Sequence, residues 1–253
     1  MPPQERQEPD LLGAREAARR AALLRGGQVE VVGRLPYSSN RTFLARCCDD
    51  EGETPAVYKP VAGERPLYDF PEETLYRREV AAHLVDAALG WGFVPLTIAR
   101  NDLPLGPGSL QLFVEHDPEQ HYFTLLEGHR ATFQRLAVFD ILTNNADRKG
   151  GHCLLGDGGH VWAIDNGLTF NVEPKLRTVI WDFAGEPLPS GERAAVGSLA
   201  KRLGAADDPL RGELAELLEK TEVDALQRRA RALQQPGVFP HPDSSWSFPW
   251  PLV

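Results

Sequence analysis

The stretch that decides the fold reads Asn144-Asn145-Ala146-Asp147-Arg148-Lys149-Gly150-Gly151-His152-Cys153-Leu154-Leu155 and resumes a few residues later as Val161-Trp162-Ala163-Ile164-Asp165-Asn166-Gly167. An apolar run from Thr132 to Leu142 precedes it and predicts a helix that is buried nearly all round. After this helix come a polar loop with two adjacent glycines and an apolar strand that ends on an acid. The pattern predicts a rigid helical stem that presents a charged loop beside a short strand.

This order of elements is the layout of a kinase active site, in which one Asp meets the hydroxyl nucleophile and another holds magnesium. Asp-x-Gly alone is common in turns, so a surface hairpin with an Asx turn is the alternative. The remainder of the chain favours the kinase layout over the hairpin.

Composition limits the class of protein. The chain has 253 residues and a mass of 28.0 kDa, which fits one large domain or two small lobes. Its net charge of −9 disfavours nucleic acid and anionic membrane surfaces as partners. Neither a run of eighteen apolar residues nor an apolar signal-peptide core is found, and three cysteines make neither a disulfide framework nor a zinc site. These features predict a cytoplasmic protein.

The pattern along the chain predicts strands first and helices later, which is an α+β class with two lobes. Helices are expected at Leu11–Leu24, Glu72–Leu89, Asp208–Leu218 and Val223–Gln234, and strands at Val29–Leu35, Thr42–Cys47, Ala56–Pro60, Phe93–Ala99 and Ser109–Glu115. The expected divisions are a helical extension at 1–26, an N-lobe at 27–116 and a C-lobe at 117–253. The Pro- and aromatic-rich segment Pro236–Val253 is either an extended tail pinned by its rings or disordered.

Two residues in the predicted N-lobe suggest a site for an anion. Alternation places Val57 and Lys59 on one face of a strand, and an inward lysine needs an anionic partner. Glu79 lies beside the apolar stripe of the following helix and is able to turn toward such a lysine. The alternatives are a lysine on an exposed edge strand and a solvated glutamate. Residues 36–41 suit either a plain hairpin turn or a loop that covers phosphates.

Several motifs together resemble a known family. Val57-Tyr58-Lys59-Pro60, Glu79, Asp147-Arg148 and Ala163-Ile164-Asp165-Asn166-Gly167-Leu168 occur in this order. The set resembles the phosphatidylinositol 3-/4-kinase superfamily, most closely the type II phosphatidylinositol 4-kinases and their bacterial relatives, and more distantly the HipA-type protein kinases. The resemblance covers roughly Val31 to Phe170. It implies a two-lobed, atypical protein-kinase-like fold with an antiparallel-sheet N-lobe and a mainly helical C-lobe.

The resemblance also implies a role for each matching residue. Lys59 would contact the phosphates of ATP, oriented by Glu79, and Ser38, Ser39 and Asn40 would cover them. The hinge that holds adenine would be Gln111, Leu112, Phe113 and Val114. Asp147 would act as the catalytic base or orient the acceptor hydroxyl, and Asp165 would chelate magnesium. Arg148 and Lys149 would offset charge on the transferred group.

One position departs from the family pattern, which has Asn as a second metal ligand where this chain has His152. Imidazole is a poor ligand for Mg²⁺ and a better one for Mn²⁺. Three interpretations stay open: a kinase that tolerates His152 or prefers manganese, a kinase that uses Asn144 or Asn145 instead, and a pseudokinase.

The resulting hypothesis is an ATP-dependent phosphotransferase that uses Mg²⁺ or Mn²⁺. Type II lipid kinases carry a cysteine-rich acylation segment after the strand lysine, but here no cysteine separates Lys59 from Glu79. The expected acceptor is therefore a hydroxyl group of a protein, this protein itself included, or of a small molecule, and not a membrane lipid. The alternatives are a non-catalytic nucleotide-binding scaffold and an enzyme that transfers AMP.

Overall fold

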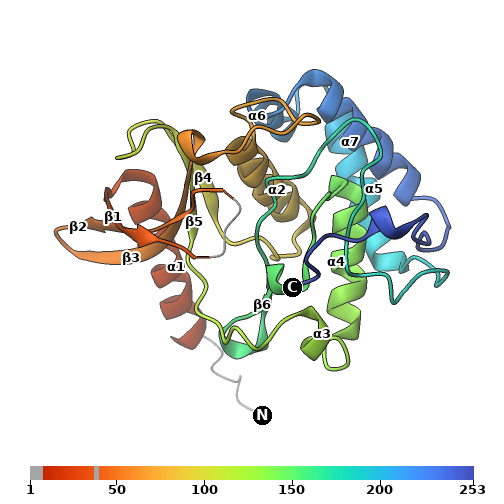
Figure 1. The fold of residues 1–253 in the computed structure, drawn as a ribbon, viewed down its shortest axis with the longest axis horizontal. Coiled ribbons are helices and arrows are strands. Elements are labelled where there is room, and N and C mark those ends of the chain that lie inside the picture. The colour runs from red at the N-terminus through yellow and green to blue at the C-terminus, as the bar shows by residue number, and fades with distance from the viewer. Residues whose placement is uncertain (1–7, 37–39) are drawn as a thin grey trace, which may run out of the picture. The chain divides into compact units, whose positions relative to one another are not determined.

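The antiparallel sheet and most of the helices lie in different units of the chain. The computed structural model describes residues 8–36 and 40–253, so Ser38 and Ser39 lie outside the described residues. One unit consists of Met1–Arg65 and Leu96–Phe113, and the other of Pro66–Pro95 and Val114–Val253. The predicted α+β class is confirmed, with the five-stranded sheet in the first unit and a mainly helical second unit (Figure 1).

The sheet of the first unit has the strand order β1-β2-β3-β5-β4, and every neighbouring pair is antiparallel. Its strands are β1 (Gln28–Arg34), β2 (Phe43–Asp49), β3 (Gly52–Pro60), β4 (Thr97–Arg100) and β5 (Gly108–Leu112). Strand β3 begins four residues before the predicted start, because a tight turn already pairs Asp49 with Gly52. All five strands overlap the predicted ones.

Helix α1 (Glu8–Gly26) covers one face of this sheet. Its Leu23 and Leu24 pack with Ala56 and Tyr58 of β3, and all four side chains are buried. The helix can turn directly into β1 because Gly27 has no side chain: a Cβ there would lie 2.6 Å from the carbonyl oxygen of Leu23. Strand alternation therefore places Val57 and the half-buried Lys59 together on the sheet face opposite α1.

The second unit is built on helices whose apolar residues form one continuous core. They are α2 (Leu75–Leu89), α3 (Tyr122–Leu125), α4 (Arg130–Thr143), α5 (Ser190–Gly204), α6 (Pro209–Leu217) and α7 (Lys220–Leu233). Helices α5 and α7 lie side by side (Figure 1). A short hairpin of β6 (Cys153–Leu155) and β7 (Val161–Ala163) follows the polar loop. Within the described residues, no helix combines the length and the apolar character that crossing a membrane requires.

Helix α2 differs from the prediction in its grouping. The expected N-lobe at 27–116 included this helix, but it belongs to the mainly helical unit. Its Ala81, Ala82 and Val85 are fully buried in the core that contains Phe133 and Leu136 of α4. Burial of this apolar stripe against other helices explains the grouping. Helix α1, expected as a separate extension at 1–26, belongs with the sheet for the same reason.

Candidate active site

The loop that carries Asp147 is shaped by two asparagines at the end of α4. Asn144 ends the helix in the left-handed conformation with φ of 54°, which Asn tolerates better than most residues. The side-chain oxygen of Asn145 then accepts a hydrogen bond from the backbone N–H of Asp147 at 2.9 Å, which forms an Asx turn. This turn redirects the chain so that Asp147 leaves the buried end of the helix.

Asp165 follows β7 and also has a left-handed backbone, with φ of 57°. A positive φ is uncommon outside glycine and is maintained by surrounding contacts. One such contact comes from α2, where the buried carboxylate of Glu79 accepts a hydrogen bond from the backbone N–H of Asn166 at 2.9 Å. Glu79 therefore fixes the segment that presents Asp165.

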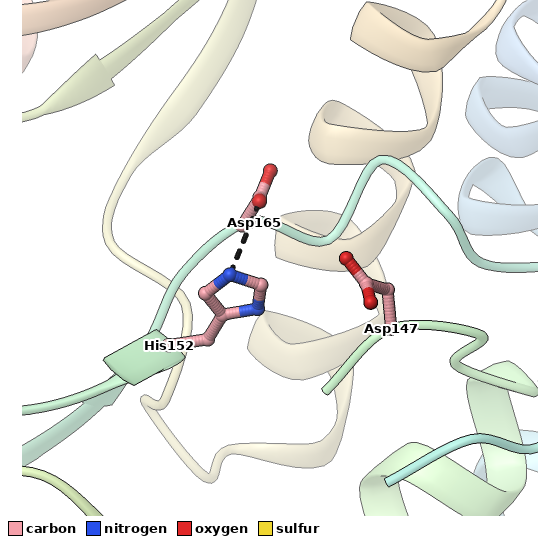
Figure 2. A group of neighbouring side chains, drawn as sticks. All are labelled: Asp147, His152 and Asp165. Atoms are coloured by element: carbon pink, nitrogen blue, oxygen red, sulfur yellow. Dashed lines mark ion pairs between the residues drawn. The ribbon is translucent and has the colours of Figure 1, made fainter. Parts of the chain in front are cut away.

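Asp147, His152 and Asp165 converge although they come from three different segments (Figure 2). His152 ends the short 3-10 helix η2 (Gly150–His152), and its Nε2 lies 3.3 Å from Oδ2 of Asp165. One ligand atom from each of the three residues lies within 4.8 Å of the other two. Two carboxylates and an imidazole form a donor set that suits Mn²⁺ better than Mg²⁺, because nitrogen is a poor magnesium ligand.

A cation accompanies the candidate catalytic base. The ammonium of Lys149 lies 3.0 Å from Oδ2 of Asp147. Burial raises the pKa of Asp147, while the charge of Lys149 acts against this effect and that of Asp165 adds to it. The resemblance implied that Lys149 offsets charge on a transferred group, and its place beside Asp147 is compatible with that role.

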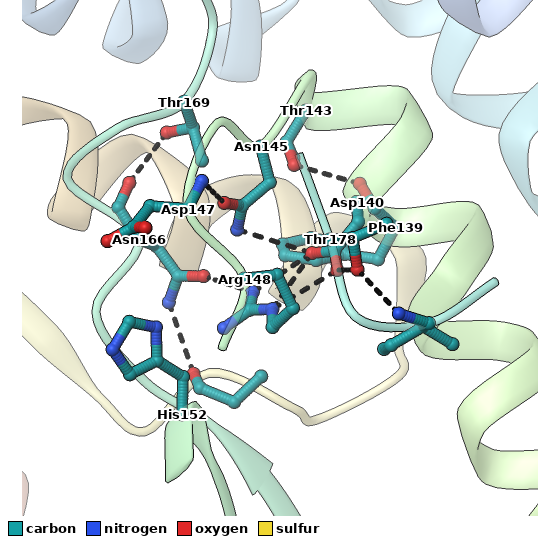
Figure 3. Close-up of polar contacts among 12 residues, drawn as sticks. Phe139, Asp140, Thr143, Asn145, Asp147, Arg148, His152, Asn166, Thr169 and Thr178 are labelled. Carbon is teal, nitrogen blue, oxygen red and sulfur yellow. Dashed lines mark hydrogen bonds and ion pairs between the residues drawn. The ribbon is translucent and has the colours of Figure 1, made fainter. Parts of the chain in front are cut away.

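Arg148 occupies a different place from the one implied by the resemblance. Its side chain is fully buried, and its guanidinium is hydrogen-bonded to Asp140, to the carbonyl oxygen of Ile164 and to Oδ1 of Asn166 (Figure 3). The expected contact with a transferred group requires an accessible guanidinium, and this one is committed to neighbours inside the protein. Arg148 joins the loop of Asp147 to the loop of Asp165.

Asn144 and Asn145, the alternative metal ligands, are likewise engaged in hydrogen bonds inside the protein. The Asn144 amide donates to the carbonyl oxygens of Asn171 and Glu173 and accepts from the backbone of Lys175. The Asn145 amide bonds to Asp140 and to the backbone of Asp147. Both side chains are nearly inaccessible, which favours His152 over either asparagine as the partner of Asp165.

Several residues of the first unit that were predicted to bind the nucleotide form hydrogen bonds within the protein. Oδ1 of Asn40 accepts from the backbone N–H of Arg65 at 3.0 Å, so this side chain is engaged with the segment that follows β3. Among the predicted hinge residues, the backbone N–H groups of Leu112 and Phe113 donate to Leu96 and Pro55. The Gln111 amide donates to Thr97 at 2.8 Å, and Val114 already belongs to the second unit. Contact of these residues and Lys59 with a nucleotide stays a prediction, as does the pairing of Lys59 with Glu79.

Asp140 is a residue of the candidate site that sequence reasoning missed. It lies on α4, is fully buried, and accepts hydrogen bonds from Arg148, Asn145 and Thr178. A signal for it exists in the sequence, because a lone acid in a helix predicted to be buried all round must have a partner inside the protein.

Comparison with known proteins places the chain in a family. No family model matches the sequence. The chain is 40% identical to Protein Rv2133c of Mycobacterium tuberculosis over 91% of its own length and 94% of the length of that protein. The chain belongs to the Rv2133c family. Among solved structures, it is similar to the Helicobacter pylori proinflammatory kinase CtkA with a TM-score of 0.48 and 10% identity, over 83% of this chain and 97% of that chain.

Membership in the Rv2133c family does not name a reaction, and the likeness to CtkA is too low to assign one. The chemistry of this family member is therefore argued from its own site. That site combines two carboxylates and an imidazole with an adjacent ammonium, on loops fixed by a fully buried ion pair.

Proposed function

We propose that this protein is an ATP-dependent phosphotransferase that acts on the hydroxyl group of a protein or a small molecule. The observation that carries the proposal is the convergence of Asp147, His152 and Asp165 at the positions where the sequence resembles the phosphatidylinositol 3-/4-kinase superfamily. Phosphoryl transfer needs a carboxylate for the attacking hydroxyl and another for a metal ion. The cluster offers both.

Each residue has a distinct part in the proposed reaction. Asp147 orients the acceptor hydroxyl and takes up its proton, and Lys149 beside it places a positive charge near the reacting groups. Asp165 and His152 would hold a divalent cation, which when bound neutralises charge on the phosphates of ATP. Lys59 contributes a phosphate contact from the sheet, by the family resemblance.

A buried scaffold supports this assignment. Asp140 and Arg148 are fully buried and hold the two loops together, while the three site residues keep accessible surface. A site that positions groups for chemistry requires such rigid support, because small displacements greatly reduce the rate.

A non-catalytic nucleotide-binding protein is the second candidate, favoured by the one departure from the family pattern. His152 stands where that pattern has a metal-binding Asn. Such a protein would bind ATP without consuming it. An enzyme that transfers AMP would attach the α-phosphate of ATP to the acceptor, whereas a kinase would attach the γ-phosphate.

The proposal is tested by incubating the full-length protein with ATP labelled on either the γ- or the α-phosphate, with Mg²⁺ or Mn²⁺. We expect ATP consumption or transfer of γ-label by the parent protein and its loss in Asp147→Asn. The matched control is Asp157→Asn, which removes an exposed acid from the turn between β6 and β7 and leaves activity unchanged. Nucleotide-induced thermal stabilisation without turnover would support the non-catalytic candidate, and transfer of α-label would support AMP transfer. The absence of both turnover and nucleotide-induced thermal stabilisation would refute a nucleotide site.

A further inference from the structure

The C-terminal segment Ser244–Val253 packs against the loop that carries the candidate base. The backbone N–H of Gly150 donates to the carbonyl oxygen of Leu252 at 2.7 Å, and the backbone N–H of Thr178 donates to that of Ser247 at 3.1 Å. Gly150 permits this close approach, since a Cβ there would lie 3.3 Å from the oxygen of Leu252. Backbone hydrogen bonds hold the segment in place, whereas the sequence pattern left two alternatives, a tail pinned by its aromatic rings and a disordered tail.

These rings remain largely exposed. Trp246 is 76% accessible and Trp250 is 87% accessible, although large aromatic side chains contribute most when they are buried. Neighbouring exposed aromatic side chains on one segment are typical of a binding surface. The segment is thus fixed by its backbone while its rings are available to a ligand.

A cavity of about 380 Å³ lies between this segment and the active-site loop. Its lining residues are Ala146, Asp147, Arg177, Ser245, Trp246, Phe248, Pro249 and Trp250. The volume lies near the lower end of the range for small-molecule pockets. Because Asp147 is part of the lining, a molecule in this cavity would lie against the candidate base.

The charges of the lining favour an anionic ligand. Asp147 is paired with Lys149 at 3.0 Å, so its charge is already balanced. The guanidinium of Arg177 stacks over the ring of Trp246 at 6.0 Å, and among the described residues it forms no hydrogen bond or ion pair. A guanidinium stacked on an aromatic face keeps its in-plane N–H groups available to a carboxylate or a phosphate.

We infer that this cavity is the acceptor site and that it takes a small alcohol with a flat apolar body and an anionic group. The inference rests on the proposed phosphotransferase function. Trp246 and Trp250 would contact the flat body, Arg177 would bind the anion, and Asp147 would meet the hydroxyl. In the transfer, the hydroxyl oxygen forms a bond to the γ-phosphorus of ATP, the bond from that phosphorus to ADP breaks, and Asp147 takes the hydroxyl proton.

Binding of 4-(hydroxymethyl)benzoate, with the uncharged 4-(hydroxymethyl)benzamide as its matched control, tests the site apart from the chemistry. By titration calorimetry, we expect the parent to bind the carboxylate roughly tenfold or more tightly than the amide, because a charged hydrogen bond is lost with the amide. Arg177→Gln should remove this preference, and Arg177→Lys should restore part of it. Trp246→Ala should weaken both compounds, whereas Trp246→Phe retains binding. The control Arg228→Gln removes an exposed arginine of α7 and should change nothing.

The outcomes separate the pocket from the proposed function. Equal binding of the two compounds by the parent, equal binding of the carboxylate by parent and Arg177→Gln, or no binding at all would overturn the acceptor site. Thermal unfolding at the parent temperature would confirm that Arg177→Gln is folded. Binding with the expected preference but without transfer of γ-label to the bound alcohol would sustain the pocket and overturn the phosphotransferase. Transfer of γ-label at the same rate by the parent and by Arg177→Gln would sustain the phosphotransferase and overturn the acceptor site.

Discussion

Two clusters of polar side chains lie around the loops of Asp147 and Asp165, and they differ in how their polar groups are satisfied. The buried cluster consists of Asp140, Arg148 and Asn166, which are fully inaccessible, and Arg148 is hydrogen-bonded to each of the other two (Figure 3). The open cluster consists of Asp147, His152 and Asp165, whose side chains keep between 14% and 46% of their accessibility (Figure 2). Hydrogen bonds inside the protein satisfy the first cluster, whereas the second gathers two acids at one place.

The two clusters are made from adjacent residues. Asp147 precedes Arg148, and Asp165 precedes Asn166, so in each loop one residue of a pair enters the buried cluster and its neighbour enters the open one. Because Arg148 donates to Asn166 at 2.7 Å, the buried residues fix the separation of the open ones. Like charges held together in the open cluster are unfavourable for stability and useful for binding a cation. We therefore expect the buried cluster to contribute stability and the open cluster to provide the proposed chemistry.

The largest expected effect is on stability and comes from the buried cluster. Arg148→Met leaves the carboxylate of Asp140 buried without its ion partner, and we expect a loss of about 3–5 kcal/mol in the free energy of unfolding. Lys149→Met breaks the more accessible pair with Asp147 on the same loop and should cost less than about 1 kcal/mol. Urea denaturation of both variants measures the difference. Similar losses in the two variants would abolish the distinction between the clusters.

A third acid tests what burial without an ion partner does. Asp86 of α2 is 1% exposed, Oδ2 accepts from the backbone N–H of Val94, and Oδ1 has no hydrogen-bond partner among the described residues. Burial raises the pKa of Asp86 from 3.8 to about 6. The unfolded chain then loses this proton at a lower pH than the folded protein, so Asp86 lowers stability as the pH rises from about 4 to about 6.

We expect Asp86→Asn to be more stable than the parent above pH 6, by up to about 3 kcal/mol for a shift of about two pKa units. The advantage should be small near pH 4, where Asp86 is protonated in the folded protein and about half protonated in the unfolded chain, whose pKa is 3.8. Denaturation of the two proteins at pH 4 and pH 7.5 measures this change. An advantage that does not depend on pH would mean that the charge of Asp86 is not the cause.

The open cluster should show the reverse of the buried one, with a large effect on cation binding and little on folding. Asp165→Asn removes a carboxylate ligand and a like charge beside Asp147, so we expect Mn²⁺ affinity to fall by at least about tenfold. The unfolding free energy in the absence of metal should be unchanged or slightly higher. Calorimetric titration with Mn²⁺ and denaturant melts give the two quantities. Unaltered Mn²⁺ affinity would remove Asp165 from the site.

The elements that sequence could predict are those with a strong local pattern. Residues Thr132–Leu142 repeat apolar side chains so densely that α4 was predicted to within two residues at its start and one at its end. Helix α5 was not predicted, although Val196, Leu199, Ala200 and Leu203 have helical spacing after Pro189 and are buried. Strand β3 begins at Gly52 and not at the expected Ala56, because Asp49 already pairs with Gly52 across the turn.

The sequence predicted that Asp147, His152 and Asp165 share a site, but not which of their neighbours are buried. The family resemblance implied that these three residues act at one place, and the structure shows them close together in space. The local sequence does not show which of Arg148 and Lys149 is buried. Arg148 is buried because it contacts Asp140 on α4 and Asn166 on the loop of Asp165. Which residue of a loop is buried depends on tertiary packing, and the periodicity of the sequence gives no information on that packing.

The smallest expected effect is a change of metal preference at His152, the residue by which this chain departs from the family pattern. His152→Asn replaces an imidazole nitrogen beside Asp165 with an amide oxygen, which Mg²⁺ accepts more readily. We expect the ratio of Mg²⁺ to Mn²⁺ affinity to rise several-fold, with Asp165→Asn as the reference for loss of both metals. Titration of each metal separates this outcome from a general weakening. An unchanged ratio would move His152 from the metal site to a positioning role, in which its ring fixes Asp165 through their 3.3 Å contact and the open cluster contains only carboxylate ligands.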